Sequence, residues 1–211
     1  MKTRLLLGLL ACVACQSPDS APNEAGTRLP GSDFEGPAFE FEQVREDVYQ
    51  ARGTGTVAVG ANVAIIINDD DVLVVDSHIS PAAAASLIDE LRFITDKPVR
   101  YVVNTHFHFD HAHGNQVYPA DVQVIGHEFT REMLSNGGSV GRTYQRFQEA
   151  MSSQPGYVEG QVGLTPTPPN TTLSERMTLF RGGREIRFGQ LCLSHRSGCA
   201  PRGSREDLRV A

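Results

Sequence analysis

The chain has 211 residues, enough for one domain with a hydrophobic core, and its 40% hydrophobic and 21% charged residues are typical of a globular protein. The formal net charge is −6 and no basic cluster is present, which argues against a nucleic-acid partner, because phosphate binding needs grouped Lys and Arg side chains. A small-molecule substrate is compatible with this composition.

The N-terminus predicts export. A positively charged start precedes an apolar run from Leu5 to Val13, which is too short to span a bilayer and is typical of a secretory signal. Cys12 and Cys15 each follow an alanine, and a small residue before a cysteine at the end of such a run resembles a bacterial lipobox. We predict a signal peptide over residues 1–15 that is lipidated on Cys15, with Cys12 as the alternative cysteine and a plain secretory signal as the alternative reading.

The expected location follows from this signal. The protein would be periplasmic, or anchored by lipid to the membrane and in contact with it only through that anchor. Residues 16–38 are rich in Pro, Gly and polar residues and lack apolar periodicity, so we predict a disordered tether. No cysteine lies between Cys15 and Cys192, so the body of the chain should contain no disulfide.

The first folded segment is predicted to be rich in β-structure. Apolar and polar residues alternate from Phe39 to Arg52, which predicts strands. Two apolar runs, Asn62–Ile67 and Val72–Asp76, flank four turn-forming residues and predict a hairpin. Because these runs are almost continuously apolar, we expect both faces of the sheet to be covered.

Helices and strands then alternate. Ser80 and Pro81 predict a helix start, and apolar residues follow at helical spacing as far as Ile94. Strands are predicted at Val99–Asn104 and Val122–Ile125.

The remaining elements complete an α/β order. Helices are predicted at His127–Leu134 and Arg142–Met151, and a loop at Pro155–Pro169. Arg176–Phe180 and Glu185–Phe188 should form a hairpin around two glycines. We therefore expect a layered α/β fold with its site at the C-terminal end of a strand.

A metal-binding motif follows the strand that ends at Asn104. Four of the seven histidines lie within residues 106–113. In an extended segment His106 and His108 point the same way, Asp110 continues the alternation, and His111 lies beside it. Imidazoles with one carboxylate suit zinc, and iron or manganese less specifically. Two ions held close together could activate a shared water.

The His-x-His-x-Asp-His pattern resembles the signature of the metallo-β-lactamase superfamily. Its context agrees, because Val74-Val75-Asp76 resembles the strand-end aspartate that braces the metal loop in that family. Neighbouring residues agree as well: Asn104 and Thr105 precede the motif, and Gly114 and Asn115 follow it. The order and spacing from Ala64 to Glu132 match the opening half of the family's domain.

This resemblance implies an αββα sandwich and a hydrolase that uses two zinc ions. A metal-bound hydroxide would attack an ester, lactone, thioester, β-lactam or phosphoester bond. By that resemblance His106 and His108 would bind the first metal, Asp110 and His111 the second, and Asp110 would also orient the water. Asp76 would support the loop.

The other histidines are weaker candidates. His78 could approach the site, but a supporting or surface position is favoured. His113 is interpreted as a loop or supporting residue, and His127 as a structural or capping residue. Asn170 begins a glycosylation sequon by pattern only.

The chain departs from the family pattern after Phe188. We expect residues 39–188 to hold about the first half to two-thirds of the sandwich, and residues 189–211 to be an atypical tail, through frameshift or truncation. The resemblance implies a third histidine for the first metal after this strand, usually followed by Thr or Ser. In a neighbouring reading frame Ser194-His195-Arg196 can encode such a His-Thr pair, which the DNA past codon 188 would test. Alternatively, His195 itself binds metal.

The second metal site is therefore expected to be incomplete, so at most one ion should bind firmly. We also expect the 211-residue chain to fold poorly. The competing interpretation is a non-catalytic metal-binding lipoprotein or pseudo-enzyme. An iron-dependent redox member of the family is a third interpretation, which would require a flavin partner domain. The oligomeric state is not predicted.

Overall fold

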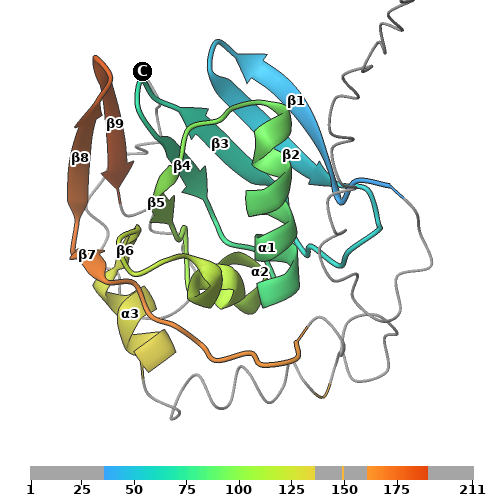
Figure 1. The fold of residues 1–211 in the computed structure, drawn as a ribbon. Coiled ribbons are helices and arrows are strands. Elements are labelled where there is room, and N and C mark those ends of the chain that lie inside the picture. Colours follow the sequence, from blue (N-terminus) through green and yellow to red (C-terminus); the bar gives the residue numbers. More distant parts are fainter. Residues whose placement is uncertain (1–35, 136–148, 150–160, 190–211) are drawn as a thin grey trace, which may run out of the picture.

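The computed structural model describes residues 36–135, 149 and 161–189. The predicted signal with Cys12 and Cys15, most of the tether, and the tail with His195 lie outside these residues. Of the helix predicted at Arg142–Met151 only Glu149 is described, and it is helical. Within the described part, the strands form a seven-stranded sheet in the order β1 to β7 and a separate hairpin of β8 and β9 (Figure 1).

The first four strands are antiparallel and lie where the alternation of the sequence predicts them. They are β1 (Phe39–Arg45), β2 (Val48–Gly53), β3 (Val63–Ile67) and β4 (Val72–Val75). Successive strands pair as hairpins, for example with Ile65 opposite Val74. The turn between β3 and β4 closes through the Asn68 amide nitrogen, which donates to the carbonyl of Asp71 at 2.8 Å. Both predicted strand pairs are thus confirmed.

The sheet continues with parallel strands. They are β5 (Val99–Val103), β6 (Gln123–His127) and β7 (Thr171–Leu173), and each pairs in parallel with the strand before it. Strand β7 was not predicted, because three residues are too few to show an alternating pattern. Parallel strands bring their C-terminal ends to one edge of the sheet, and the loops that follow β4, β5 and β6 meet there.

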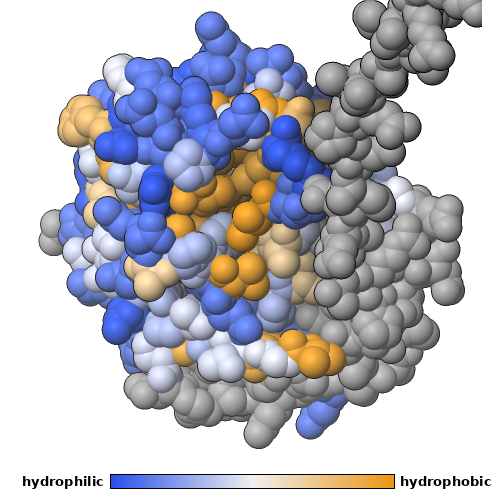
Figure 2. Space-filling model, viewed as in Figure 1, coloured by the Kyte–Doolittle hydropathy of each residue, from blue (hydrophilic) through white to orange (hydrophobic). Residues whose placement is uncertain are grey.

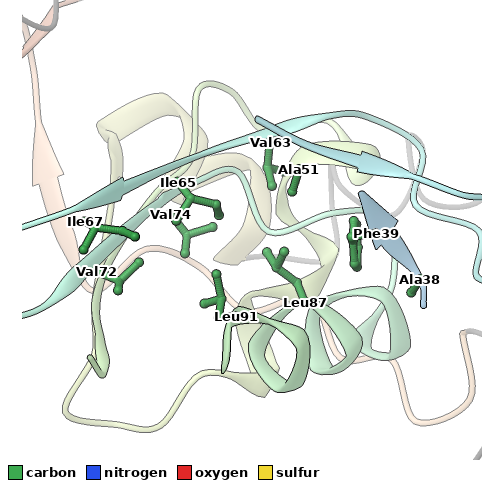
Figure 3. Packing of buried hydrophobic residues seen from close by; sticks show 10 residues of the cluster. All are labelled: Ala38, Phe39, Ala51, Val63, Ile65, Ile67, Val72, Val74, Leu87 and Leu91. Atoms are coloured by element: carbon green, nitrogen blue, oxygen red, sulfur yellow. The ribbon is translucent and has the colours of Figure 1, made fainter. Parts of the chain in front are cut away.

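Helix α1 (Pro81–Glu90) joins β4 to β5 and packs on one face of the sheet. The Ser80 hydroxyl accepts a hydrogen bond from the Ala83 amide at 3.1 Å, so the predicted cap is confirmed. The helix ends earlier than the apolar spacing predicted, because Leu91–Phe93 tighten into the 3₁₀ helix η1. Leu87 and Leu91 point from this helical segment toward the strands (Figure 3).

The buried residues under α1 alternate along the strands with those of the opposite face. Side chains from β1 to β4 pack beneath α1, among them Val63, Ile65, Ile67, Val72 and Val74. The residues between them, such as Ile66 and Leu73, face the other way and contact the hairpin of β8 (Arg176–Arg181) and β9 (Arg184–Gly189).

Strand β9 covers that second face through Ile186 and Phe188, which are 1% and 5% exposed. The end of the hairpin is fixed by Arg181, whose guanidinium pairs with the buried carboxylate of Asp71. Both the predicted hairpin and the predicted covering of both sheet faces are confirmed. Figure 2, seen from the side of α1, shows apolar residues gathered near the centre of this face within a mostly polar rim.

The remaining helices lie along the C-terminal edge of the sheet. They are α2 (Phe109–Ala112), the 3₁₀ helix η2 (His113–Val117) and α3 (Glu128–Ser135). No helix among the described residues is long and apolar enough to cross a membrane. The loop predicted at Pro155–Pro169 is irregular over its described part, which begins at Gln161.

Candidate metal centre

The predicted metal motif lies at the C-terminal end of β5, where the parallel strands end. His106 and His108 are in the segment that leaves the strand, and His108 keeps an extended backbone with φ −62° and ψ 148°. Asp110 and His111 are already in helix α2, which begins at Phe109. The prediction that Asp110 continues an extended alternation is therefore wrong. A helical turn brings it beside His111 instead.

The motif's side chains nevertheless gather in one place. The ring centroid of His106 lies 4.6 Å from that of His108 and 4.1 Å from that of His111. One carboxylate oxygen of Asp110, Oδ2, lies 3.3 Å from Nε2 of His111. Three imidazoles and a carboxylate thus lie side by side at the end of β5.

Asp76 lies directly beneath this cluster, at the end of β4. It adopts a left-handed backbone conformation with φ 70°, which aspartate tolerates better than most residues. Its Oδ2 is 2.7 Å from Nδ1 of His111, and its Oδ1 accepts a hydrogen bond from the backbone amide of Thr105 at 2.8 Å. One buried carboxylate therefore fixes both the start of the segment 105–111, here called the metal loop, and the ring of His111.

The same carboxylate acts on His106 through Thr105. The Thr105 hydroxyl lies 2.9 Å from Oδ2 of Asp76 and 3.0 Å from Nδ1 of His106. A hydroxyl has one proton, and a carboxylate can only accept, so Thr105 donates to Asp76 and its oxygen accepts from His106. His106 then carries its proton on Nδ1, which leaves Nε2 free to bind a metal.

The neighbouring charges set the protonation states of the loop. Burial lowers the pKa of His111, but its hydrogen bonds to Asp110 and Asp76 outweigh burial and raise that pKa to about 9. The hydrogen bond from His111 lowers the pKa of Asp110. Burial, together with the charges of His111 and His108, lowers the pKa of His106. At neutral pH His111 is thus protonated and Asp110 ionised.

These donors suit zinc in their chemistry, because imidazole nitrogens and a carboxylate are its usual ligands alongside cysteine. Among the described residues, however, no group of three or more such side chains is arranged to hold one ion. The contact of His111 with Asp110 accounts for part of this, since it occupies the nitrogen that would bind metal. Removing the proton on Nε2 would free that nitrogen while Asp76 keeps the proton on Nδ1.

The loop between β2 and β3 lies against the metal loop. Gly60, at φ +78°, approaches so closely that a side-chain carbon on it would lie 2.9 Å from Cβ of Asp110. Only a glycine fits this approach, because it has no Cβ and tolerates a positive φ. Gly60 was not predicted as part of the site, although a glycine shortly before an apolar run was a usable signal.

The other histidines are buried or structural. His78 is fully buried, so the predicted surface alternative is wrong; its ring stacks against Phe39 with centroids 4.9 Å apart. His113 is also buried, within η2, with its ring 6.0 Å from that of Phe109. His127 accepts a hydrogen bond from the Phe129 amide at 3.0 Å, so its predicted capping role is confirmed.

Asn170, the first residue of the sequon, connects the segment before β7 to β6. Its side-chain nitrogen donates to the carbonyl of Val122, and its oxygen accepts from the amide of Val124, both at 2.9 Å. Both ends of the amide are therefore used in holding the chain beside β6.

Comparison with known proteins places the chain in a family. Residues 56–184 match the model of the metallo-beta-lactamase superfamily. The chain is 30% identical over 105 residues to a probable metallo-hydrolase, YqjP, of Bacillus subtilis, which covers 48% of this chain and 33% of that protein. It is 33% identical over 116 residues to the alpha subunit of a 2,4-dinitroanisole O-demethylase of a Nocardioides species, covering 54% and 34%. The chain thus spans about a third of the length of these relatives.

A solved structure shares the fold. A double mutant of the sec-alkyl sulfatase PisA1 superposes with a TM-score of 0.54 at 20% identity, over 72% of this chain and 27% of that one. At this level of identity the similarity concerns the fold alone.

Proposed function

Because the chain belongs to the metallo-β-lactamase superfamily, we propose that it is a zinc-dependent hydrolase. The observation that carries this proposal is the clustering of three imidazole rings and one carboxylate at the end of β5. His106 and His108 would hold one zinc ion, and Asp110 with His111 would hold a second. The proposed substrate is a small molecule with an ester, lactone, thioester, β-lactam or phosphoester bond.

A zinc ion at this site would lower the pKa of a water molecule and stabilise negative charge on the substrate oxygen. The chain's own residues prepare that chemistry. Asp110 is ionised at neutral pH and can hold a proton taken from the attacking water. Asp76 keeps the rings of His106 and His111 in the orientation that directs Nε2 of each toward the site.

The test is to purify the full chain, measure its zinc content, and assay one substrate for each of the five bond types. Asp110→Asn should lower bound zinc and abolish hydrolysis. Asp89→Asn is the matched control, because Asp89 is an exposed carboxylate on α1 that pairs with Arg92. Zinc-loaded protein that hydrolyses none of the five bonds would support the non-catalytic alternative. Activity that survives in Asp110→Asn would contradict the proposal.

We further propose that the protein is exported and anchored through Cys15, with Cys12 as the alternative. The support is the sequence of the apolar N-terminal segment. Labelling of the expressed protein with a fatty-acid analogue should be lost in Cys15→Ser and retained in Cys12→Ser. The reverse pattern would assign Cys12, and labelling of neither parent nor variants would favour a plain secretory signal.

A further inference from the structure

A buried polar network lies beside the metal loop and includes Ser77, the residue after Asp76. Its centre is Asn115 in η2, which is 2% exposed. The Asn115 oxygen accepts from the Ser77 hydroxyl at 2.8 Å and from the Asn104 side-chain nitrogen at 3.0 Å. Its nitrogen donates to the Asn104 oxygen at 2.8 Å and to the carbonyl of Thr167 at 2.9 Å. Every hydrogen-bonding position of this side chain is therefore occupied.

The network holds the backbone of His111. The carbonyl of His111 accepts from the Ser77 amide at 2.8 Å and from the Asn104 side-chain nitrogen at 3.2 Å. Asn115 bonds to the side chains of both residues, accepting from the Ser77 hydroxyl and from the Asn104 side-chain nitrogen. His111 is thus fixed twice, through its ring by Asp76 and through its backbone by groups that Asn115 positions.

The network also reaches a distant segment. Ser77 follows β4, Asn104 follows β5, Asn115 lies in η2, and Thr167 precedes β7, so four separate stretches of chain meet at one amide. The neighbouring residue Gln116 also binds this segment. Its described side-chain hydrogen bonds go only to the backbone of Gly163 and Thr165.

We infer that Asn115 is a positioning residue for the metal centre: through Ser77 and Asn104 it sets where the backbone of His111 presents its ring. The inference rests on the proposed metal site. The physical reason is that a buried amide with all its partners satisfied is rigid, whereas removing it leaves buried donors and acceptors unpaired. The two groups that hold the backbone of His111 would then be less firmly placed, while the contact of its ring with Asp76 stays in place.

The test compares Asn115→Ala and Asn115→Asp with Gln116→Ala in the full chain. Asn115→Asp keeps the size of the side chain and its acceptors but loses the donors to Asn104 and Thr167, so it serves if the alanine variant does not fold. Zinc affinity, measured by competition with a chromophoric chelator, should fall about tenfold in both Asn115 variants. Gln116→Ala is the matched control, because it detaches the segment at Gly163 and Thr165 without touching the network.

Two readouts do not require metal. In metal-free protein, the amide of Ser77 should exchange with solvent faster in both Asn115 variants. The proton on Nδ1 of His111 should change its NMR resonance in these variants and keep it in Gln116→Ala. A role limited to overall stability would leave that resonance unchanged once the protein is folded.

The outcomes separate the two proposals. If the parent protein binds no zinc, the proposed function fails, and the two metal-free readouts still decide the role of Asn115. If the Asn115 variants keep parental zinc affinity and an unchanged His111 resonance, the inference is wrong. It is equally overturned if Gln116→Ala has the same effect as Asn115→Ala.

Discussion

Asp76 and His111 stand 35 positions apart in the chain, yet the carboxylate of one lies 2.7 Å from the ring nitrogen of the other. The parallel pairing of β4 with β5 makes this contact, because the two residues follow strand ends that lie side by side. The orientation of the His111 ring is thus set by sheet register.

Replacing Asp76 by Asn should weaken zinc binding without unfolding the protein. Asparagine tolerates the left-handed backbone at this position and can still accept from the Thr105 amide, but it removes the charge facing His111. We expect zinc affinity to fall about 10- to 100-fold, measured by chelator competition. Asp89→Asn is the control, and an unchanged affinity in Asp76→Asn would show that the contact does not support the metal loop.

The burial of His78 should make stability depend on pH. Burial lowers the pKa of His78 to about 4. The charge of Asp76 partly opposes this effect, and the charge of His111 adds to it. Neither ring nitrogen makes a hydrogen bond of normal geometry, although the backbone of Val59 and Ala61 lies close enough to raise the pKa.

Between pH 4 and pH 6.5, His78 is protonated in the unfolded chain but neutral in the folded protein. The contribution of His78 to stability is therefore fully present above pH 6.5 and is lost as the pH falls toward 4. We expect a loss of about 2–3 kcal/mol between pH 7.5 and 4.5. His78 has a left-handed backbone with φ 67°, which asparagine tolerates. His78→Asn removes the titration, so urea unfolding should show a shallower loss in this variant. Equal losses in both proteins would refute the prediction.

Gly114 should not tolerate a methyl group. A Cβ at this position would lie 1.9 Å from the carbonyl oxygen of Ser77, which belongs to the backbone and cannot turn aside. Gly114→Ala should therefore lower the free energy of unfolding by about 3 kcal/mol or more. At Gly189 a Cβ would meet no atom of the described residues within 4 Å, so Gly189→Ala is the matched control and should retain parental stability in thermal melts. A stable Gly114→Ala variant would contradict the close approach of η2 to the Ser77 backbone that follows β4.

The pair of Arg181 with Asp71 should hold the β8–β9 hairpin on the sheet. Asp71 is 1% exposed, and its other oxygen already accepts from the Asn68 side chain at 2.8 Å. Arg181→Ala would leave a buried carboxylate without its cation, so it should lower the free energy of unfolding clearly more than removal of an exposed arginine. Arg187→Ala removes an exposed partner of Glu185 and should cost less than about 1 kcal/mol. Chemical denaturation would measure both, and equal losses would show that burial of Asp71 has no effect.

Much of the fold could be predicted because its signals are local. The alternation from Phe39 to Arg52, the turn formers between β3 and β4, and the Ser80 cap each act within a few residues of chain. The motif from His106 to His111 is equally local, so its residues could be named before their geometry was known.

Contacts between distant segments could not be predicted in this way. β7 exists because Thr171 pairs with Ile125, and nothing in three residues indicates such a partner. The helix that begins at Phe109 displaced Asp110 from the expected alternation, since tertiary packing and not the pattern decides where the strand geometry stops. The supporting contacts of Thr105 and Asn115 likewise join residues that the sequence keeps apart.

The bond between Asn115 and Thr167 bears on the order in which the site is assembled during synthesis. Asp76 precedes the metal loop, so its contact with His111 can form once β4 and β5 have left the ribosome. Thr167 is made 52 residues after Asn115, and until then the buried amide lacks one partner. A zinc ion arriving early would meet a loop whose rings are oriented but whose backbone is only partly held. If the chain folds as it is made, the contact of Asp76 with His111 needs nothing beyond α2, whereas the support through Asn115 is complete only after Thr167 has been synthesised.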